Sequence, residues 1–428
     1  MALSGGSYLA VILFLLCAEY LLNLWTDRLN LKCLSPVLPR EFEGVYDAGK
    51  YARSQTYLVE TTRFESFAAA FTLLFSVIFI VEGGFNLLDS AARSLGLGVI
   101  LTGLVFSFML KFLLDMIGLP FELYDTFVLE EKYGFNKTTA ATFALDFLKE
   151  WGLSLAIGAP ALAAVLWLFG AEGPRAWLYV WGFITALQLF MSFVSPVLLL
   201  PLFNKFTPLA DGPLKASLSA YAAAQKFRMG GVFIMDGSKR SSKANAFFTG
   251  FGRFKRIVLF DTLIEKFTVE ELTAVLAHEM GHYKKKHILF FTLLGIVQTG
   301  FMLWLVSFFM GNAGLSAAFG MEHVSVYASL VFFGFIYSPV SFFLGILANW
   351  LSRRSEREAD AYAVRTYGDP EAFGSALKKL AADNFANLTP HPFKVFLEYG
   401  HPPVLERLRN LGRPAAARTG LETSADIL

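Results

Sequence analysis

The stretch A-H-E-M-G-H-Y-K-K-K-H-I-L-F-F-T-L-L, residues 277–294, joins three patterns. Two histidines lie four residues apart, a lysine tract follows them, and a long apolar segment begins at residue 288, one residue after the lysines. The apolar segment is typical of a membrane-spanning helix, and lysines at its edge are typical of a membrane surface. The histidine pair is therefore expected beside a bilayer. The rest of the sequence has to show whether the pair binds a metal ion or only packs within a helix.

The composition indicates a membrane protein. The chain has 428 residues, 55% of them hydrophobic, and a mean hydropathy of +0.50, which is more apolar than the core of a soluble enzyme requires. The formal net charge of +2 gives no reason to expect a nucleic-acid partner. Cys17 and Cys33 form no C-x-x-C pair, so any metal ion is expected to be held by His and carboxylate side chains.

Seven apolar stretches are long enough to cross a bilayer as helices, which takes about 20 residues each. They are approximately 7–25, 67–88, 95–119, 151–170, 177–200, 288–310 and 324–350. The first is expected to be a retained span, because no basic segment precedes it and no small-residue cleavage site follows it. The polar tail, 414–428, is expected to be disordered.

The loops between these stretches predict which end faces the cytoplasm. The segments 26–66, 120–150, 201–287 and the tail from 351 are long and rich in Lys and Arg. The segments 89–94, 171–176 and 311–325 are short, with Arg93 and Arg175 as their only basic residues. By the positive-inside rule the long set is cytoplasmic, and the histidine pair with it.

The histidine pair is predicted to lie on one face of a helix. Thr268 and Glu271 have the spacing of a capping box, which starts a helix at this point. His278 and His282 then lie one turn apart, where two imidazoles reach a single zinc ion with Zn–N distances of about 2.0 Å. Glu279, beside the first histidine, is the expected general base. The alternative is that the pair is only a packing feature.

Catalytic zinc sites usually have three protein ligands, so a carboxylate is needed as well. The seventh apolar stretch runs into a helical segment that carries both Glu356 and Glu358 and ends at Gly368. Glu358 shares its face with arginines, as on a solvated surface, whereas Glu356 shares its face with Asp360 and small residues. We therefore predict Glu356 as third ligand and Asp360 as an acceptor that orients a ligating histidine.

Further stretches resemble one known family, the type I CAAX prenyl proteases, which are membrane-embedded zinc metalloendopeptidases. The resemblance covers most of the chain. Its motifs are the H-E-x-x-H pair, the 356–360 segment, T-F-V-L-E-E-K-Y-G-F-N-K at 126–137, P-L-F-N-K-F-T-P-L at 201–209, D-G-S-K-R-S-S-K-A-N-A-F at 236–247, and H-P-P-V-L-E-R-L at 401–408.

The resemblance implies a set of site residues. His278, His282 and Glu356 would bind one Zn²⁺ per chain, with Glu279 as the base. A strand around Asn245 and Ala246 would pair with an extended substrate, and His401 and Arg407 would line the site, where either would stabilise the oxyanion. Lys243 and Phe247 stand where many members carry His and Tyr, so the resemblance assigns them no role.

From the residues alone these segments are less specific. The segments 232–235, 245–248 and 256–260 read as short strands of a small sheet. An edge strand there would bind peptide through its backbone, while the alternative is that Asn245 only supports a turn. His401-Pro402-Pro403 is also compatible with a proline-stiffened turn. His287, His323 and His391 are interpreted as ordinary polar residues.

The predicted fold is mainly α: a polytopic membrane protein of seven helices enclosing a chamber, with a small α+β zinc-protease domain on the cytoplasmic side. The expected segments are 1–201 with spans one to five, 202–287 with the sheet and the H-E-x-x-H helix, 288–350 with spans six and seven, and 351–428 with the third ligand and the H-P-P motif.

The predicted function is an integral membrane zinc metalloendopeptidase. Its expected partners are the lipid bilayer and peptide or protein substrates, either prenylated proteins or, as the alternative, membrane proteins cut for quality control. Its membrane is expected to be a bacterial inner membrane or one of endoplasmic reticulum type. Glu19, Lys111 and Asp115 within the spans leave a transporter open, although they would equally face a chamber. A scaffold with a structural zinc ion is a third alternative.

Overall fold

The structure is a computed structural model that describes residues 4–227, 230–249 and 256–411, so the tail expected to be disordered lies outside the described residues. Seven helical segments in the described part are long and apolar enough to cross a membrane, which confirms the predicted number. They are α1 (Gly5–Lys32), α2 (Ala48–Val81), α4 with α5 (Val99–Tyr124, Glu131–Tyr133), α6 with α7 (Ala140–Leu153, Ala159–Ala171), α8 with α9 (Ala176–Val194, Leu200–Phe203), α13 (His287–Ser307) and α15 (Val326–Tyr367).

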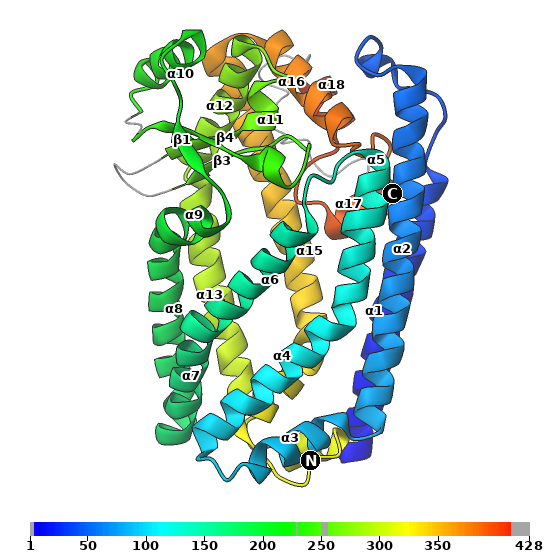
Figure 1. The fold of residues 1–428 in the computed structure, drawn as a ribbon, viewed down its shortest axis with the longest axis vertical. Helices are drawn as coiled ribbons and strands as arrows, with labels where there is room; N and C mark the ends of the chain where they lie inside the picture. Colours follow the sequence, from blue (N-terminus) through cyan, green and yellow to red (C-terminus); the bar gives the residue numbers. More distant parts are fainter. Residues whose placement is uncertain (1–3, 228–229, 250–255, 412–428) are drawn as a thin grey trace, which may run out of the picture.

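The second span differs from its prediction. The predicted stretch 67–88 runs through Gly83, which adopts a left-handed conformation with φ of 73° and ends the helix. The following helix, α3 (Gly84–Ser94), lies across the end of the molecule opposite the sheet (Figure 1). The predicted loop 89–94 is therefore helical. The loop 311–325 likewise contains a short helix, α14 (Ala313–Ala318).

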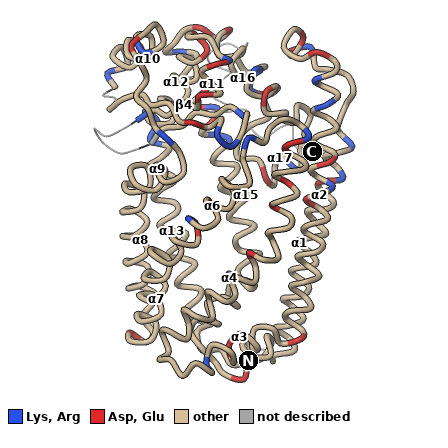
Figure 2. Tube along the Cα trace, in the orientation of Figure 1, with Lys and Arg blue, Asp and Glu red and all other residues tan. Residues whose placement is uncertain are grey.

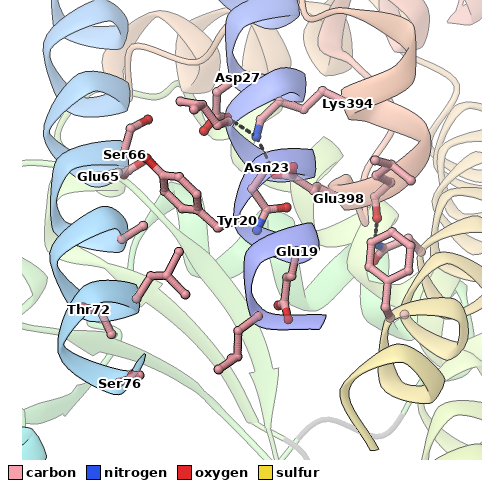
Figure 3. A pocket seen from close by; sticks show the side chains of 18 residues that line it. Glu19, Tyr20, Asn23, Asp27, Glu65, Ser66, Thr72, Ser76, Lys394 and Glu398 are labelled. Atoms are coloured by element: carbon pink, nitrogen blue, oxygen red, sulfur yellow. Dashed lines mark hydrogen bonds and ion pairs between the residues drawn. The ribbon is translucent and has the colours of Figure 1, made fainter. Parts of the chain in front are cut away.

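The spanning helices enclose a chamber, and they pack against one another in two hydrophobic clusters that bury only a small part of their surface. In the most apolar window of each, at most 17% of the residues are buried. A ring of helices has this property, because each helix turns one face to lipid and another to the interior. A cavity of about 760 Å³ lies between α1, α2, α15 and α17 (Pro392–Glu398). Figure 3 shows Glu19 and other polar side chains around this cavity, which gives an intramembrane carboxylate a polar environment.

A four-stranded sheet lies at one end of the molecule (Figure 1). Its strands are β1 (Phe206–Pro208), β2 (Val232–Met235), β3 (Ala246–Thr249) and β4 (Arg256–Phe260), in the spatial order β1-β2-β4-β3. The prediction was right for β2 and β4, one residue early for β3, and missed the three-residue β1. β3 forms one edge of the sheet, antiparallel to β4.

Helices pack against this sheet and against each other in one hydrophobic core. They are α10 (Pro213–Ala224), α11 (Asp261–Ile264), α12 (Val269–Lys284), α16 (Pro370–Asp383) and α18 (Val404–Leu411). The predicted start of α12 is confirmed, because Thr268 and Glu271 form the reciprocal capping box. Glu271 also accepts hydrogen bonds from Ser375 and Lys379 of α16, which ties the two helices together.

The seventh spanning helix enters this core. α15 has 42 residues, so at 1.5 Å per residue it is about 63 Å long, twice the roughly 30 Å of a hydrocarbon layer. It ends where predicted, at Gly368, which adopts φ of 80°. Its last turns lie beside α12. A helix that begins on the far side of the molecule thus carries Glu356 up to the histidines.

α12 and α15 approach each other at Gly281. A Cβ atom added there would lie 2.9 Å from Cα and 3.0 Å from the carbonyl oxygen of Ala359, and backbone atoms cannot turn aside as a flexible side chain does. Ala359 itself is fully buried. The small residues predicted for this face of α15 are therefore what allows the approach.

We expect Gly281→Ala to lower the free energy of unfolding by about 1–3 kcal/mol, because the added methyl group overpacks this contact. The measurement is the thermal unfolding midpoint of the detergent-solubilised protein. Gly334→Ala is the control. Gly334 lies in α15, the helix that Gly281 contacts, and a Cβ atom there would meet nothing within 4 Å, so the unfolding midpoint of this variant should be unchanged or higher. Equal midpoints for the two variants would contradict the close approach.

Candidate metal centre and active site

Two helices bring the predicted ligands together. α12 supplies His278 and His282 one turn apart, and α15 supplies Glu356. One ligand atom from each of these residues lies within 4.8 Å of the others. His278 and Glu356 are buried, with 8% and 4% of their surface exposed. The competing carboxylate, Glu358, contacts Arg354 instead.

The donor atoms have the spacing that a zinc ion requires. His282 Nε2 lies 3.2 Å from His278 Nε2 and 3.1 Å from Glu356 Oε1, and His278 Nε2 lies 3.4 Å from Glu356 Oε2. Atoms about 2.0 Å from one ion in a tetrahedral arrangement lie about 3.3 Å apart. Two nitrogens and a carboxylate are also a common donor set of catalytic zinc. The residues present therefore fit the metal.

Asp360 lies behind the first histidine. Its Oδ1 is 2.8 Å from His278 Nδ1, the nitrogen that points away from Glu356. Arg407 of α18 donates two hydrogen bonds to Asp360, from Nε at 2.9 Å and from Nη2 at 2.6 Å. A bidentate pair of this kind fixes the plane of the carboxylate. The arrangement orients the His278 ring.

The carboxylates control the protonation of His278. Burial lowers the pKa of this imidazole, but Asp360 and Glu356 outweigh burial and raise the pKa to about 9. Without a metal ion His278 is therefore protonated at neutral pH, as an imidazolium between two carboxylates. A metal ion that binds there has to displace the proton.

Glu279 faces a cavity of about 420 Å³ together with His278 and Glu356. Burial raises the pKa of Glu279, and the neighbouring histidines oppose the rise. A carboxylate with a raised pKa is suited to accept a proton and pass it on. The wall beyond Glu279 is apolar and consists of Leu263, Phe267, Val275, Phe373, Leu377 and Leu380. Sequence reasoning missed this wall, because its members come from four separate segments.

The edge strand lies at the same cavity. Asn245 and Ala246 both line it, at the start of β3. Asn245 is exposed, and its side-chain oxygen accepts a hydrogen bond from the Ala246 amide. Its backbone oxygen accepts from Phe260 of β4, so the segment is fixed from the sheet side.

His401 and Arg407 also line the cavity but differ in environment. The His401 side chain is 70% exposed, with Nδ1 3.0 Å from Glu356 Oε2. Arg407 is 13% exposed, bound to Asp360, and 3.9 Å from Glu356. Only His401 is open to an incoming molecule.

A further residue, Arg353, holds the segment before His401. Its Nη1 donates to the backbone oxygens of Val395 at 2.9 Å and Tyr399 at 2.6 Å. No sequence pattern signals this role, because both partners are carbonyl groups distant in the chain. Lys243 lies elsewhere, with its Nζ 2.8 Å from Glu130 and 3.1 Å from Tyr57.

Phe247 of β3, the second residue without an assigned role, packs its ring 6.3 Å from the ring of Phe260 on the neighbouring strand. Both residues at which the chain departs from the family pattern thus have structural partners.

Comparisons with known proteins agree over nearly the whole chain. Residues 27–205 match the family model described as CAAX prenyl protease N-terminal, five membrane helices, and residues 208–415 match that of peptidase family M48. The CAAX prenyl protease 1 homologue of Oryza sativa is 34% identical over 94% of this chain and 97% of its own length. The homologue of Arabidopsis thaliana is 33% identical over 94% and 97%.

The fold has a solved counterpart as well. The crystal structure of S. mikatae Ste24p superposes with a TM-score of 0.90 at 29% identity, and the match covers 95% of this chain and 99% of that one. Sequence, fold and donor geometry therefore lead to one conclusion: the chain belongs to the type I CAAX prenyl protease family, within peptidase family M48, and is a multi-pass membrane metallopeptidase.

Proposed function

We propose that this membrane peptidase holds one zinc ion on His278, His282 and Glu356, and that it cuts prenylated proteins near their C-terminal ends. The observation that carries the metal assignment is the mutual spacing of 3.1–3.4 Å among the three donor groups. A bound zinc ion supplies Lewis acidity, which makes hydroxide available at neutral pH and polarises a carbonyl group. The protein's own side chains supply the remaining steps.

Glu279 is the proposed general base. It takes a proton from the attacking water and returns it to the leaving amine, and its raised pKa favours holding that proton in between. His401, exposed at the cavity, is the proposed donor to the developing oxyanion. Arg407 is bound to Asp360, so we assign it to holding Asp360 and, through it, His278.

The cavity supports an extended substrate with an apolar side chain beside the cut bond. β3 is an edge strand at the cavity, so an extended chain would pair with the backbone of Ala246 and take the place of the Asn245 side chain at its amide, which fixes a chain with little side-chain selectivity. The apolar wall next to Glu279 fits an aliphatic residue. The relatives are named CAAX prenyl proteases, and this wall suits the aliphatic positions of such a sequence.

The metal site is proposed to face the cytoplasm. Figure 2 shows that most Lys and Arg residues gather at the end of the molecule that carries the sheet. Positive residues are retained on the cytoplasmic side during insertion. The proposed membrane is a bacterial inner membrane or one of endoplasmic reticulum type, where the cytoplasmic face meets lipid-anchored proteins.

The substrate is tested with two matched peptides, one farnesylated at its cysteine and one unmodified, each with and without a zinc chelator. We expect chelator-sensitive cleavage of the farnesylated peptide at least tenfold faster than of the unmodified one. The readout is the mass of the released fragments. Equal cleavage of both peptides would contradict the prenyl requirement and favour membrane proteins in general as substrates. Cleavage that resists the chelator would contradict the metal mechanism.

Glu279→Gln should retain zinc and lose activity, because the amide keeps the shape of the carboxylate and cannot accept the proton. General base catalysis contributes about 10²–10⁴-fold, so we expect turnover to fall by at least about a hundredfold. Turnover and zinc content are measured on the same preparation. Glu270→Gln, an exposed residue of the same helix, is the control with wild-type turnover. Wild-type activity in Glu279→Gln would exclude it as the base.

Asp360→Asn should weaken zinc binding by about tenfold or more, because the neutral amide no longer orients His278 or pairs fully with Arg407. Zinc affinity is measured by competition with a chelator of known affinity. Asp211→Asn is the matched control, since that side chain is 96% exposed. An unchanged affinity in Asp360→Asn would leave Asp360 with a structural role only.

A further inference from the structure

A third histidine lies against the second ligand. His287 is the first residue of α13, and only Lys285 and Lys286 separate that helix from α12. Lys286 adopts a left-handed conformation with φ of 62°, which makes the turn between the helices tight. As a result His287 Nδ1 lies 3.2 Å from His282 Nδ1.

With a metal ion on His282, this contact would fix the tautomers of both rings. His282 Nε2 is the nitrogen that faces His278 and Glu356, so it has to carry the lone pair of a ligand. The proton of a neutral His282 is then on Nδ1, and Nδ1 donates to His287 Nδ1. His287 therefore accepts at Nδ1 and carries its own proton on Nε2.

The proton of His287 in turn has an acceptor. His287 Nε2 lies 3.4 Å from Glu358 Oε2 on α15. The other carboxylate oxygen of Glu358 accepts from Arg354 Nε at 3.3 Å, one turn earlier on the same helix. The His287 side chain is only 9% exposed, so the surrounding protein restricts the orientation of its ring. Each nitrogen of the two rings thus has at least one polar partner.

We propose that His287 and Glu358 are positioning residues that hold the ring of His282 in its metal-binding tautomer and orientation. They do for the second histidine what Asp360 and Arg407 do for the first. The inference rests on the proposed metal site. It assigns a function to a histidine and a glutamate whose sequence patterns indicate no more than polar surface residues.

The arrangement also connects the metal site to the membrane. His287 begins the sixth spanning helix, and Glu358 belongs to the extension of the seventh. The orientation of His282 therefore depends on how these two helices are placed relative to α12.

The test compares zinc affinity and stability in His287→Ala, His287→Asn and wild-type protein. We expect about 10–100-fold weaker zinc binding in His287→Ala, measured by competition with a chelator. In His287→Asn the side-chain oxygen takes the place of Nδ1, so affinity should return to within about threefold of wild type. Lys285→Ala, exposed in the same turn, is the control with wild-type affinity.

The unfolding midpoint of the metal-free protein separates positioning from folding. A positioning role predicts metal-free midpoints close to wild type in both variants. Wild-type affinity in His287→Ala, or an equal loss in His287→Asn, would overturn the inference. If His287→Ala does not fold, Glu358→Ala decides: reduced affinity supports the inference, and unchanged affinity refutes it. A wild-type protein that binds no zinc would instead remove the proposed function itself.

Discussion

The close approach of α12 and α15 is the constraint on which the proposed metal site depends. Gly281 leaves room for the backbone of Ala359, so the two helices lie near enough for side chains on their facing surfaces to meet. Because the contact involves backbone atoms, it allows little adjustment, and the donor groups of His278, His282 and Glu356 are held at their spacing by the packing of the helices. A larger residue at either position would separate the ligands as well as the helices.

The charges around this contact are balanced in pairs. Glu356 and Asp360 are buried carboxylates, and each would be costly to desolvate alone. Arg407 and the protonated His278 compensate them in the metal-free protein. A zinc ion brings two positive charges and displaces one proton, so the site exchanges one form of compensation for another. The two buried carboxylates are therefore compensated by positive charge both with and without a bound metal ion.

The chamber explains features that are unusual in a spanning helix. Ionisable residues such as Glu19 lie along a cavity, where polar side chains surround them, rather than against lipid (Figure 3). α15 forms part of the chamber wall and is long enough to extend beyond it, so the same helix also supplies Glu356, the proposed third ligand.

Local rules were sufficient for much of this protein. The number of spans follows from apolar length, because a bilayer requires about 20 residues per helix, and the start of α12 follows from a capping box that involves only its own residues. Helical periodicity placed two histidines on one face and indicated the face of Glu356. The break at Gly83 depends on one dihedral angle, which hydropathy does not report. Other features could not be predicted in this way: the contacts of Arg353, the apolar wall of the cavity and the contact between His287 and His282. Each of them depends on which helices lie side by side, and only the tertiary packing of segments distant in the sequence determines this.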